Sequence, residues 1–391
     1  MDRARWWTAA LFLFVFGDAI AMQARGPILP SLEETFGVSE AALGLIAPAG
    51  TAGFVVAVVA TGILAGRVRM RRTLVLSALG VVVALLVMSA SPLYAVFLLA
   101  LLAQGAAAGA FRGIDRAVLS HLHAARRGRI YAAYALVWAV GAVLGPQLVS
   151  GVLVVADWRA VFVVIALCFL PTILIASRTE LPSMDAERSI SRSALRELLQ
   201  RRSVIGACVG IMLVGAIEGI LFTWLVYYAS GFYETATANL LLSVYLLAYM
   251  PARLGYTFLI DRVPSLLLVL ATAIPTIPAL AVAFSGQTGP ILFVAVFVAG
   301  AGLSSGFPTL SAYAVEAAPE YSGPLNAVTN GSTYFGIAFA PAVVGVLAEW
   351  YGIGRALWVT VGLAVALLGT IVLTWLWTGS ASAPTGDASR T

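Results

Sequence analysis

The sequence contains no lysine, and all 23 of its basic residues are arginine. Chemistry that depends on a lysine amine, such as a Schiff base, is therefore excluded. Charged residues of all kinds are scarce, at 10% of the 391 residues, whereas a soluble domain carries about 25%. This composition excludes a water-soluble fold.

Cysteine and histidine are also rare, with two residues of each. Cys168 and Cys208 lie inside apolar stretches and do not indicate a disulfide. His121 and His123 lie together at the end of an apolar stretch, without a cluster of metal ligands around them. The Gly-x-x-x-x-Gly-Lys phosphate loop is missing as well. We therefore expect no metal, no cofactor, no ATP hydrolysis and no enzymatic activity.

Hydrophobic residues make up 61% of the chain and fall into long runs. A run of about 20 residues crosses roughly 30 Å of hydrocarbon as a helix, whereas the strands of a membrane barrel are short and alternate. The sequence therefore predicts an all-α integral membrane protein with twelve transmembrane helices. We expect them near 6–28, 41–65, 73–90, 92–120, 129–155, 158–177, 203–229, 236–260, 264–284, 289–314, 324–350 and 354–377.

The arginines gather in alternate connections between these runs, and acidic residues occupy most of the others. The positive-inside rule then places both termini in the cytoplasm of a multi-pass protein of the plasma membrane. The net charge of +5 is explained by this arrangement and indicates no nucleic-acid partner. The arginine-rich connections are Arg3 to Arg5, Arg67 to Arg72, Arg126 to Arg129 and 178–202.

One long polar segment, 178–202, divides the chain into two halves of six runs each. Within it, leucines recur at helical spacing among arginines, which is typical of a basic amphipathic helix on the inner membrane surface. We expect six-helix bundles over 1–177 and 203–377. The tail, 378–391, is rich in small and polar residues, and we expect it to be disordered.

The two halves repeat one another at an offset of 195 residues. The stretch from Gly62 recurs from Thr257, Gly141 to Pro146 recurs as Gly336 to Pro341, and His121 to Gly128 corresponds to Glu316 to Gly323. Three matches in one register indicate a duplication. Because six spans is an even number, both copies enter the membrane in the same orientation, as in transporters with parallel repeats.

These motifs resemble those of the major facilitator superfamily, and the resemblance covers essentially the whole chain. Gly62-x-Leu64-x-x-Arg67 resembles the family's signature between helices 2 and 3, and Asp261-Arg262 resembles its weaker copy between helices 8 and 9. Gly141-x-x-x-Gly145-Pro146 is similar to the helix 5 pattern. The resemblance implies two bundles that rock about a central cavity lined by helices 1, 4, 7 and 10, which is alternating access.

Ionisable residues inside lipid are costly and are therefore functional candidates. Asp18 lies about 18 Å into the first helix among apolar neighbours, so burial favours its neutral form and would let it exchange a proton near neutral pH. Glu218 lies in helix 7 and corresponds to Gln23 in the repeat. We predict that Asp18 and Glu218 couple transport to protons; the alternative is that they only hydrogen-bond neighbouring helices.

Several further polar and aromatic residues are candidate substrate contacts. Arg25 either attracts an anionic substrate or extends to the headgroups. Arg112 either faces the cavity or pairs with Asp115 as an anchor near the cytoplasm. For the others, the alternatives are helix packing, lipid contact or the inner charge network. The candidates are Gln23, Arg25, Arg112, Trp138, Tyr227, Tyr249, Arg253 and Asn330.

The resemblance also implies a cytoplasmic gate between the bundles. In the family, an acid at position 66 latches the two bundles together, but this chain has Gly66 there and keeps Asp261 only in the second copy. We therefore expect a looser inner gate, or one latched by other acids. The residues assigned to this gate are Gly62, Gly66, Arg67, Asp115, Arg116, Asp261, Arg262 and Glu316.

Together these features predict secondary active transport of a small solute, coupled to protons, by a monomer in a lipid bilayer. Three alternatives remain open from sequence: a drug/proton antiporter working as an exporter, an uncoupled facilitator of a small organic anion, and a non-transporting membrane sensor. Leu101 stands where drug antiporters of the family usually carry an arginine, which counts against the first.

Overall fold

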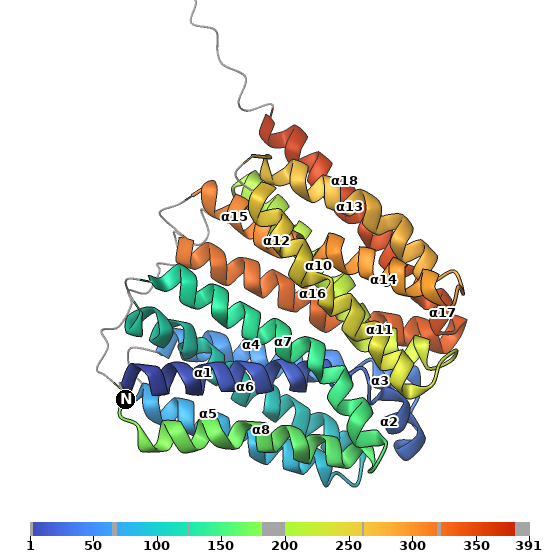
Figure 1. The fold of residues 1–391 in the computed structure, drawn as a ribbon. Helices are drawn as coiled ribbons and strands as arrows, with labels where there is room; N and C mark the ends of the chain where they lie inside the picture. The colour runs from blue at the N-terminus through green and yellow to red at the C-terminus, as the bar shows by residue number, and fades with distance from the viewer. Residues whose placement is uncertain are drawn as a thin grey trace, which may run out of the picture.

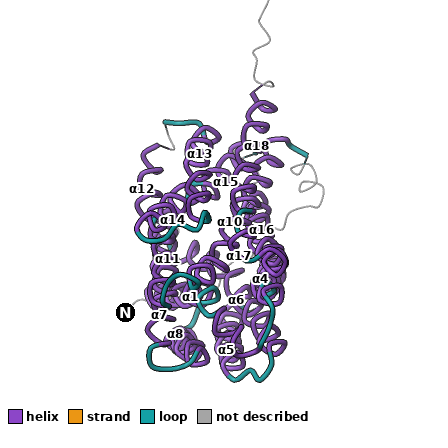
Figure 2. Tube along the Cα trace, turned by 90° about the vertical axis from the view of Figure 1, so that its right-hand side faces the viewer, coloured by secondary structure: helices purple, strands orange, loops and turns teal. Residues whose placement is uncertain are grey.

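The computed structural model describes residues 3–64, 69–123, 126–181, 200–259, 262–318 and 322–379. Every regular element in these ranges is a helix (Figure 2). The helices are α1 (Arg3–Gln23), α2 (Leu29–Phe36), α3 (Glu40–Leu43), α4 (Ile46–Leu64), α5 (Met70–Ser89), α6 (Tyr94–Leu122), α7 (Arg127–Leu153), α8 (Trp158–Arg178), α10 (Arg202–Ala229), α11 (Thr235–Leu247), α12 (Tyr249–Leu259), α13 (Ser265–Ala283), α14 (Pro290–Leu303), α15 (Gly306–Glu316), α16 (Ser322–Tyr351), α17 (Ile353–Ala356) and α18 (Val359–Gly379).

Within the described residues, twelve helical stretches are long and apolar enough to cross a membrane. Each overlaps one of the twelve hydrophobic runs, which confirms the predicted all-helical membrane fold. Helices α1 to α8 form one bundle and α10 to α18 form the other (Figure 1). Most of the segment predicted as an amphipathic helix (182–199) and most of the tail (380–391) lie outside the described residues.

The main difference from the sequence prediction concerns the end of the first span. The hydrophobic run extends to residue 28, but α1 ends at Gln23 and the chain turns through Arg25 before α2 begins. Gly26 and Pro27 explain this break, because glycine weakens a helix and proline cannot donate the hydrogen bond that would continue it. Arg25 therefore lies in a turn rather than on the face of α1.

The duplication seen in the sequence is also visible in how the helices cross. Gly141 of α7 packs against the backbone carbonyl of Phe16 in α1, and Gly336 of α16 packs against the carbonyl of Met212 in α10. A Cβ at either glycine would collide with that carbonyl. Small residues thus allow equivalent helices of the two bundles to approach closely, as is common in membrane bundles.

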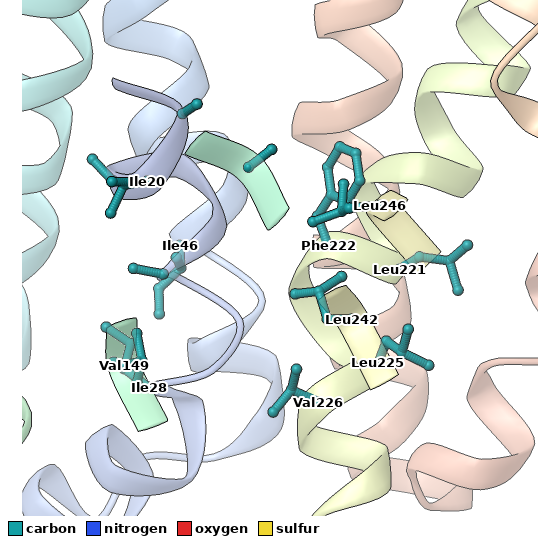
Figure 3. Packing of buried hydrophobic residues seen from close by; sticks show 14 of the residues in the cluster. Ile20, Ile28, Ile46, Val149, Leu221, Phe222, Leu225, Val226, Leu242 and Leu246 are labelled. Atoms are coloured by element: carbon teal, nitrogen blue, oxygen red, sulfur yellow. The ribbon is translucent and has the colours of Figure 1, made fainter. Parts of the chain in front are cut away.

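The molecule has two distinct ends along the helix axes. The N-terminus lies at one end, which we call the proximal end, and α2, α3 and α17 lie at the other, which we call the distal end (Figure 1). Helix α1 therefore runs from proximal to distal. Buried apolar side chains such as Ile28 and Val226 line the two facing bundles near this distal end (Figure 3).

The bundles meet tightly at the distal end through glycines. Gly26 packs against the carbonyl of Phe222 in α10, and Gly345 of α16 packs against the carbonyl of Glu40 in α3. A Cβ at either glycine would collide with the opposite backbone. Because no side chain separates these segments, the two bundles are in backbone contact there.

In the distal half of the molecule, hydrogen bonds between side chains of α7 and α11 also join the two bundles. Gln147 Nε2 donates to Ser243 Oγ at 3.0 Å, and Ser243 Oγ donates to the carbonyl of Val143 at 2.9 Å. Asn239 Nδ2 donates to Ser150 Oγ at 2.8 Å. The distal half of the interface between the bundles is therefore closed.

The glycine contacts predict how the distal end would respond to a larger side chain. Gly345→Val should force the bundles apart, because a valine cannot fit against the Glu40 carbonyl. The reporter is Val226→Cys, which replaces a residue only 2% exposed that faces the N-terminal bundle (Figure 3), in a protein without Cys168 and Cys208. We expect Gly345→Val to raise its labelling rate by a polar thiol reagent severalfold.

Gly369→Val is the matched control, because a Cβ at Gly369 would meet nothing within 4 Å. This control should leave the labelling rate unchanged. Equal labelling rates in the Gly345→Val and Gly369→Val proteins would show that the distal contact does not depend on Gly345.

Candidate functional site

A buried ion pair joins α1 to α6. Arg112 Nη1 lies 2.9 Å from Asp18 Oδ2, and the two side chains are 9% and 14% exposed. The sequence predicted that Asp18 is buried, but it paired Arg112 only with Asp115. The structure shows both contacts, since Arg112 Nε also lies 3.4 Å from Asp115 Oδ2. One guanidinium thus contacts two carboxylates in a region where unpaired charges are expensive.

Tyr134 of α7 completes this cluster. Its hydroxyl donates a hydrogen bond to Asp115 Oδ2, and the guanidinium of Arg112 lies 5.4 Å from the centre of its ring. Asp115 itself is fully buried. These partners of Asp115 all belong to the N-terminal bundle, so they do not link it to the other bundle as a latch would. Its assignment to a gate between bundles stays a prediction.

A second contact joins the same two segments about two turns nearer the distal end. Arg25 Nη2 donates to Gln104 Oε1 at 3.0 Å. Because α1 and α6 run in opposite directions, a later residue on the first segment meets an earlier residue of α6. Asp18 therefore contacts Arg112, and Arg25 contacts Gln104 nearer the distal end. Among the described residues, Arg25 Nε and Gln104 Nε2 are buried without a hydrogen-bond partner.

The C-terminal bundle carries a different polar cluster. Glu218 of α10 is 9% exposed, and its Oε1 accepts a hydrogen bond from the Tyr249 hydroxyl at 2.5 Å. The hydroxyls of Tyr249 and Tyr245 are 2.9 Å apart. The guanidinium of Arg253 lies 5.2 Å from the centre of the Tyr249 ring, and its charge acts on Glu218. No described cationic side chain lies within 4 Å of the Glu218 carboxylate, so this carboxylate has no ion-pair partner among the described residues.

The Arg25–Gln104 pair and the cluster around Glu218 lie at similar depths along the interface between the bundles. Gly26, next to Arg25, packs against Phe222 of α10. Glu218 lies one turn before Phe222 in α10, which is about 6 Å toward the proximal end. The turn after α1 therefore brings Arg25 to the level at which the C-terminal bundle holds its acid.

The other predicted substrate contacts occupy varied positions. Gln23 is fully buried, and neither of its side-chain polar atoms has a described partner. Trp138 is half-buried and packs against the apolar core. Tyr227 lies beside the carboxylates of Glu33 and Glu40 near the distal end, and Asn330 Nδ2 donates at 2.7 Å to a carbonyl of its own helix. The structure thus does not gather these four residues into one cluster.

The predicted gate is only partly described. Gly66, Arg67 and Asp261 lie outside the described residues, so the missing acid at position 66 is not tested. Gly62 lies in the last turn of α4. The remaining members, Arg116, Arg262 and Glu316, are exposed.

Sequence reasoning did not select Gln104, Tyr134 or Tyr245 as site residues. Gln104 precedes a glycine in α6, and Tyr245 lies one helical turn before Tyr249, so spacing alone could have suggested both. Tyr134 is in a different helix from Asp115, and no local pattern connects them. Among the described residues, no group of three or more acidic, histidine or cysteine side chains could hold a metal ion.

The buried pair predicts a large loss of stability when one partner is removed. Asp18→Asn leaves Arg112 with Asp115 alone, and breaking a buried ion pair costs up to about 3–5 kcal/mol. We expect the apparent melting temperature of the purified protein in detergent to fall by several degrees. Arg112→Gln in the Asp18→Asn protein should then cost less than Arg112→Gln alone.

The control is Glu180→Gln, which removes the exposed Arg3–Glu180 pair, whose side chains are 69% and 71% exposed. Such pairs contribute little, so the melting temperature should not change. Strictly additive losses for Asp18→Asn and Arg112→Gln would mean that the two side chains do not interact.

Comparison with solved structures shows similar folds at low sequence identity. A mutant of the nucleoside transporter NupG is 13% identical with a TM-score of 0.82, covering 96% of this chain and 100% of that chain. A bacterial homologue of the human lysosomal transporter Spinster, in an inward-facing and unoccupied conformation, is 13% identical with a TM-score of 0.80, covering 96% and 97%. A D-xylose-proton symporter is 14% identical with a TM-score of 0.75, covering 95% and 97%.

At this level of identity, these structures establish the fold and nothing further. No curated protein sequence matches the chain. A sequence model of the Major Facilitator Superfamily, however, matches residues 11–238 and 207–390, which together span nearly the whole chain. With its twelve apolar helices in two repeated bundles, the chain is a multi-pass membrane protein that belongs to the major facilitator superfamily of transporters.

Proposed function

We propose that the protein is a secondary active transporter that moves a small solute by alternating access and couples this movement to protons. Glu218 is the primary proton-binding residue in this proposal. The bundles move relative to one another about the polar residues of α1, α6, α10 and α12. The distal end faces the outside, and both termini lie in the cytoplasm of a plasma-membrane protein.

The observation that carries the proposal is the environment of Glu218. Its carboxyl group is almost completely buried, and one tyrosine hydroxyl at 2.5 Å is its hydrogen-bond donor. A buried carboxylate without an ion-pair partner is unfavourable, whereas the protonated form is neutral. Glu218 can therefore exchange a proton when the site opens to water on either side.

Asp18 has a different environment and therefore a different proposed role. Arg112 holds its carboxylate at 2.9 Å, which favours the charged form. A proton on Asp18 would weaken this contact and loosen α1 from α6. We propose that Asp18 is a second protonation site whose main effect is on the packing of these two helices.

The closed distal contacts support an inward-facing state for this conformation. Backbone contacts at Gly26 and Gly345, and hydrogen bonds between α7 and α11, join the bundles in the distal half. Alternating access requires these contacts to break when the transporter opens to the outside. They involve few side chains, so each can separate without exposing a buried charge.

The test is uptake into proteoliposomes with an inwardly directed or outwardly directed pH gradient and a panel of radiolabelled solutes. The wild-type protein should accumulate at least one solute against its gradient. Glu218→Gln should abolish this accumulation while retaining exchange of internal for external solute, because the variant mimics the protonated carboxyl group. The effect on driven uptake should exceed tenfold.

Glu349→Gln is the matched control, since Glu349 lies exposed near the distal end of α16. It should transport like the wild type. Solute entry that only equilibrates, at a rate independent of the pH gradient, would identify an uncoupled facilitator instead. Full proton-driven accumulation by Glu218→Gln would remove Glu218 from the mechanism.

A further inference from the structure

The guanidinium of Arg25 is a partly buried cation with no carboxylate in contact among the described residues. Its Nη2 donates to the neutral amide of Gln104 at 3.0 Å, and its Nε has no described partner. No described acid lies within 4 Å of it. Charged groups inside a membrane protein are nearly always paired or face a functional cavity, so this unmatched charge requires an explanation.

Gln104 adds a second free donor beside Arg25. Because arginine has only donors, the amide of Gln104 must turn its oxygen toward the guanidinium. This orientation directs the amide NH2 group elsewhere, and Gln104 Nε2 is buried without a described partner in a residue only 1% exposed. The pair therefore offers unfilled N–H groups on both residues and no unfilled acceptor.

The backbone around the pair leaves space for the guanidinium. Gly50 of α4 lies directly against Arg25, so a side chain at that position would displace the guanidinium. Gly105, next to Gln104, packs on the carbonyl of Gly50 and holds α4 against α6. Two glycines and Gln104 thus fix Arg25 in one position.

The carboxylate of Asp18 acts on Arg25 only from a distance and leaves its N–H groups free. Asp18 acts on Arg25 electrostatically, but its carboxylate binds Arg112 at 2.9 Å. A ligand with one negative charge would bring less uncompensated charge into this low-dielectric region than a doubly charged phosphate would. A planar carboxylate also suits the N–H groups of a guanidinium, with which it forms charge-assisted hydrogen bonds.

We propose that Arg25 and Gln104 bind the carboxylate of the transported solute, so that the substrate is a small organic monoanion. This inference rests on the proposed transport function and names its substrate class. A monoanion on Arg25 together with a proton on Glu218 adds no net charge to the protein. The loaded and empty transporters then carry the same charge through the conformational change, which makes the cotransport electroneutral.

The test is binding to the purified protein, measured by thermal stabilisation in detergent without any gradient. The probes are acetate, lactate and benzoate, each compared with its neutral amide: acetamide, lactamide and benzamide. We expect at least one carboxylate to give saturable stabilisation that its amide does not. Arg25→Gln should weaken its apparent Kd at least tenfold, and Gln104→Leu severalfold.

Arg25→Lys keeps the charge and should bind better than Arg25→Gln, which separates lost binding from misfolding. Arg355→Gln, which changes an exposed arginine near the distal end, should bind like the wild type. Equal binding of acid and amide, unchanged binding by Arg25→Gln, or no response to any carboxylate would overturn the inference. Proton-driven accumulation of a neutral solute would also overturn it, while leaving the proposed transport function intact.

Discussion

The ion pair between Asp18 and Arg112 is the contact that determines how the charges inside the N-terminal bundle are arranged. Removing two charges from water is costly, and it is tolerated only where each has a close partner. Their contact at 2.9 Å joins α1 to α6 within two membrane-spanning segments. The turn that follows α1 then brings Arg25 opposite Gln104 of α6, about two helical turns nearer the distal end. Arg25 has no carboxylate in contact, because the carboxylate of Asp18 is held by Arg112.

The two halves share their helix crossings but differ in their polar residues. Gly141 and Gly336 occupy equivalent crossings at the 195-residue offset. The same offset places Leu213 opposite Asp18 and Gln23 opposite Glu218, so neither acid is repeated. Duplication has therefore preserved the packing that makes two similar bundles, while the charges have become specialised. In the proposed mechanism, one half supplies the cation for the solute and the other supplies the carboxyl group for the proton.

Much of the fold, and part of the site, could be predicted from the sequence. The length of the hydrophobic runs is sufficient to predict twelve spans, and an acid such as Glu218 within an apolar run is conspicuous. The end of α1 was placed too late, because composition alone does not show that Gly26 breaks the helix. The contact of Arg112 with Asp18 was not predicted. Helix spacing favours the local neighbour Asp115, and the position of one helix relative to another that is distant in the sequence cannot be deduced from the residues of either helix.

The central claim is that Glu218 takes up and releases a proton inside the protein. Infrared difference spectroscopy of the purified protein between acidic and alkaline pH tests it without knowledge of the substrate, because a protonated carboxyl group absorbs separately from a carboxylate. We predict that the wild-type protein gains a carboxyl band on acidification and that this band is smaller in Glu218→Gln. Identical difference spectra for the two proteins would contradict the account.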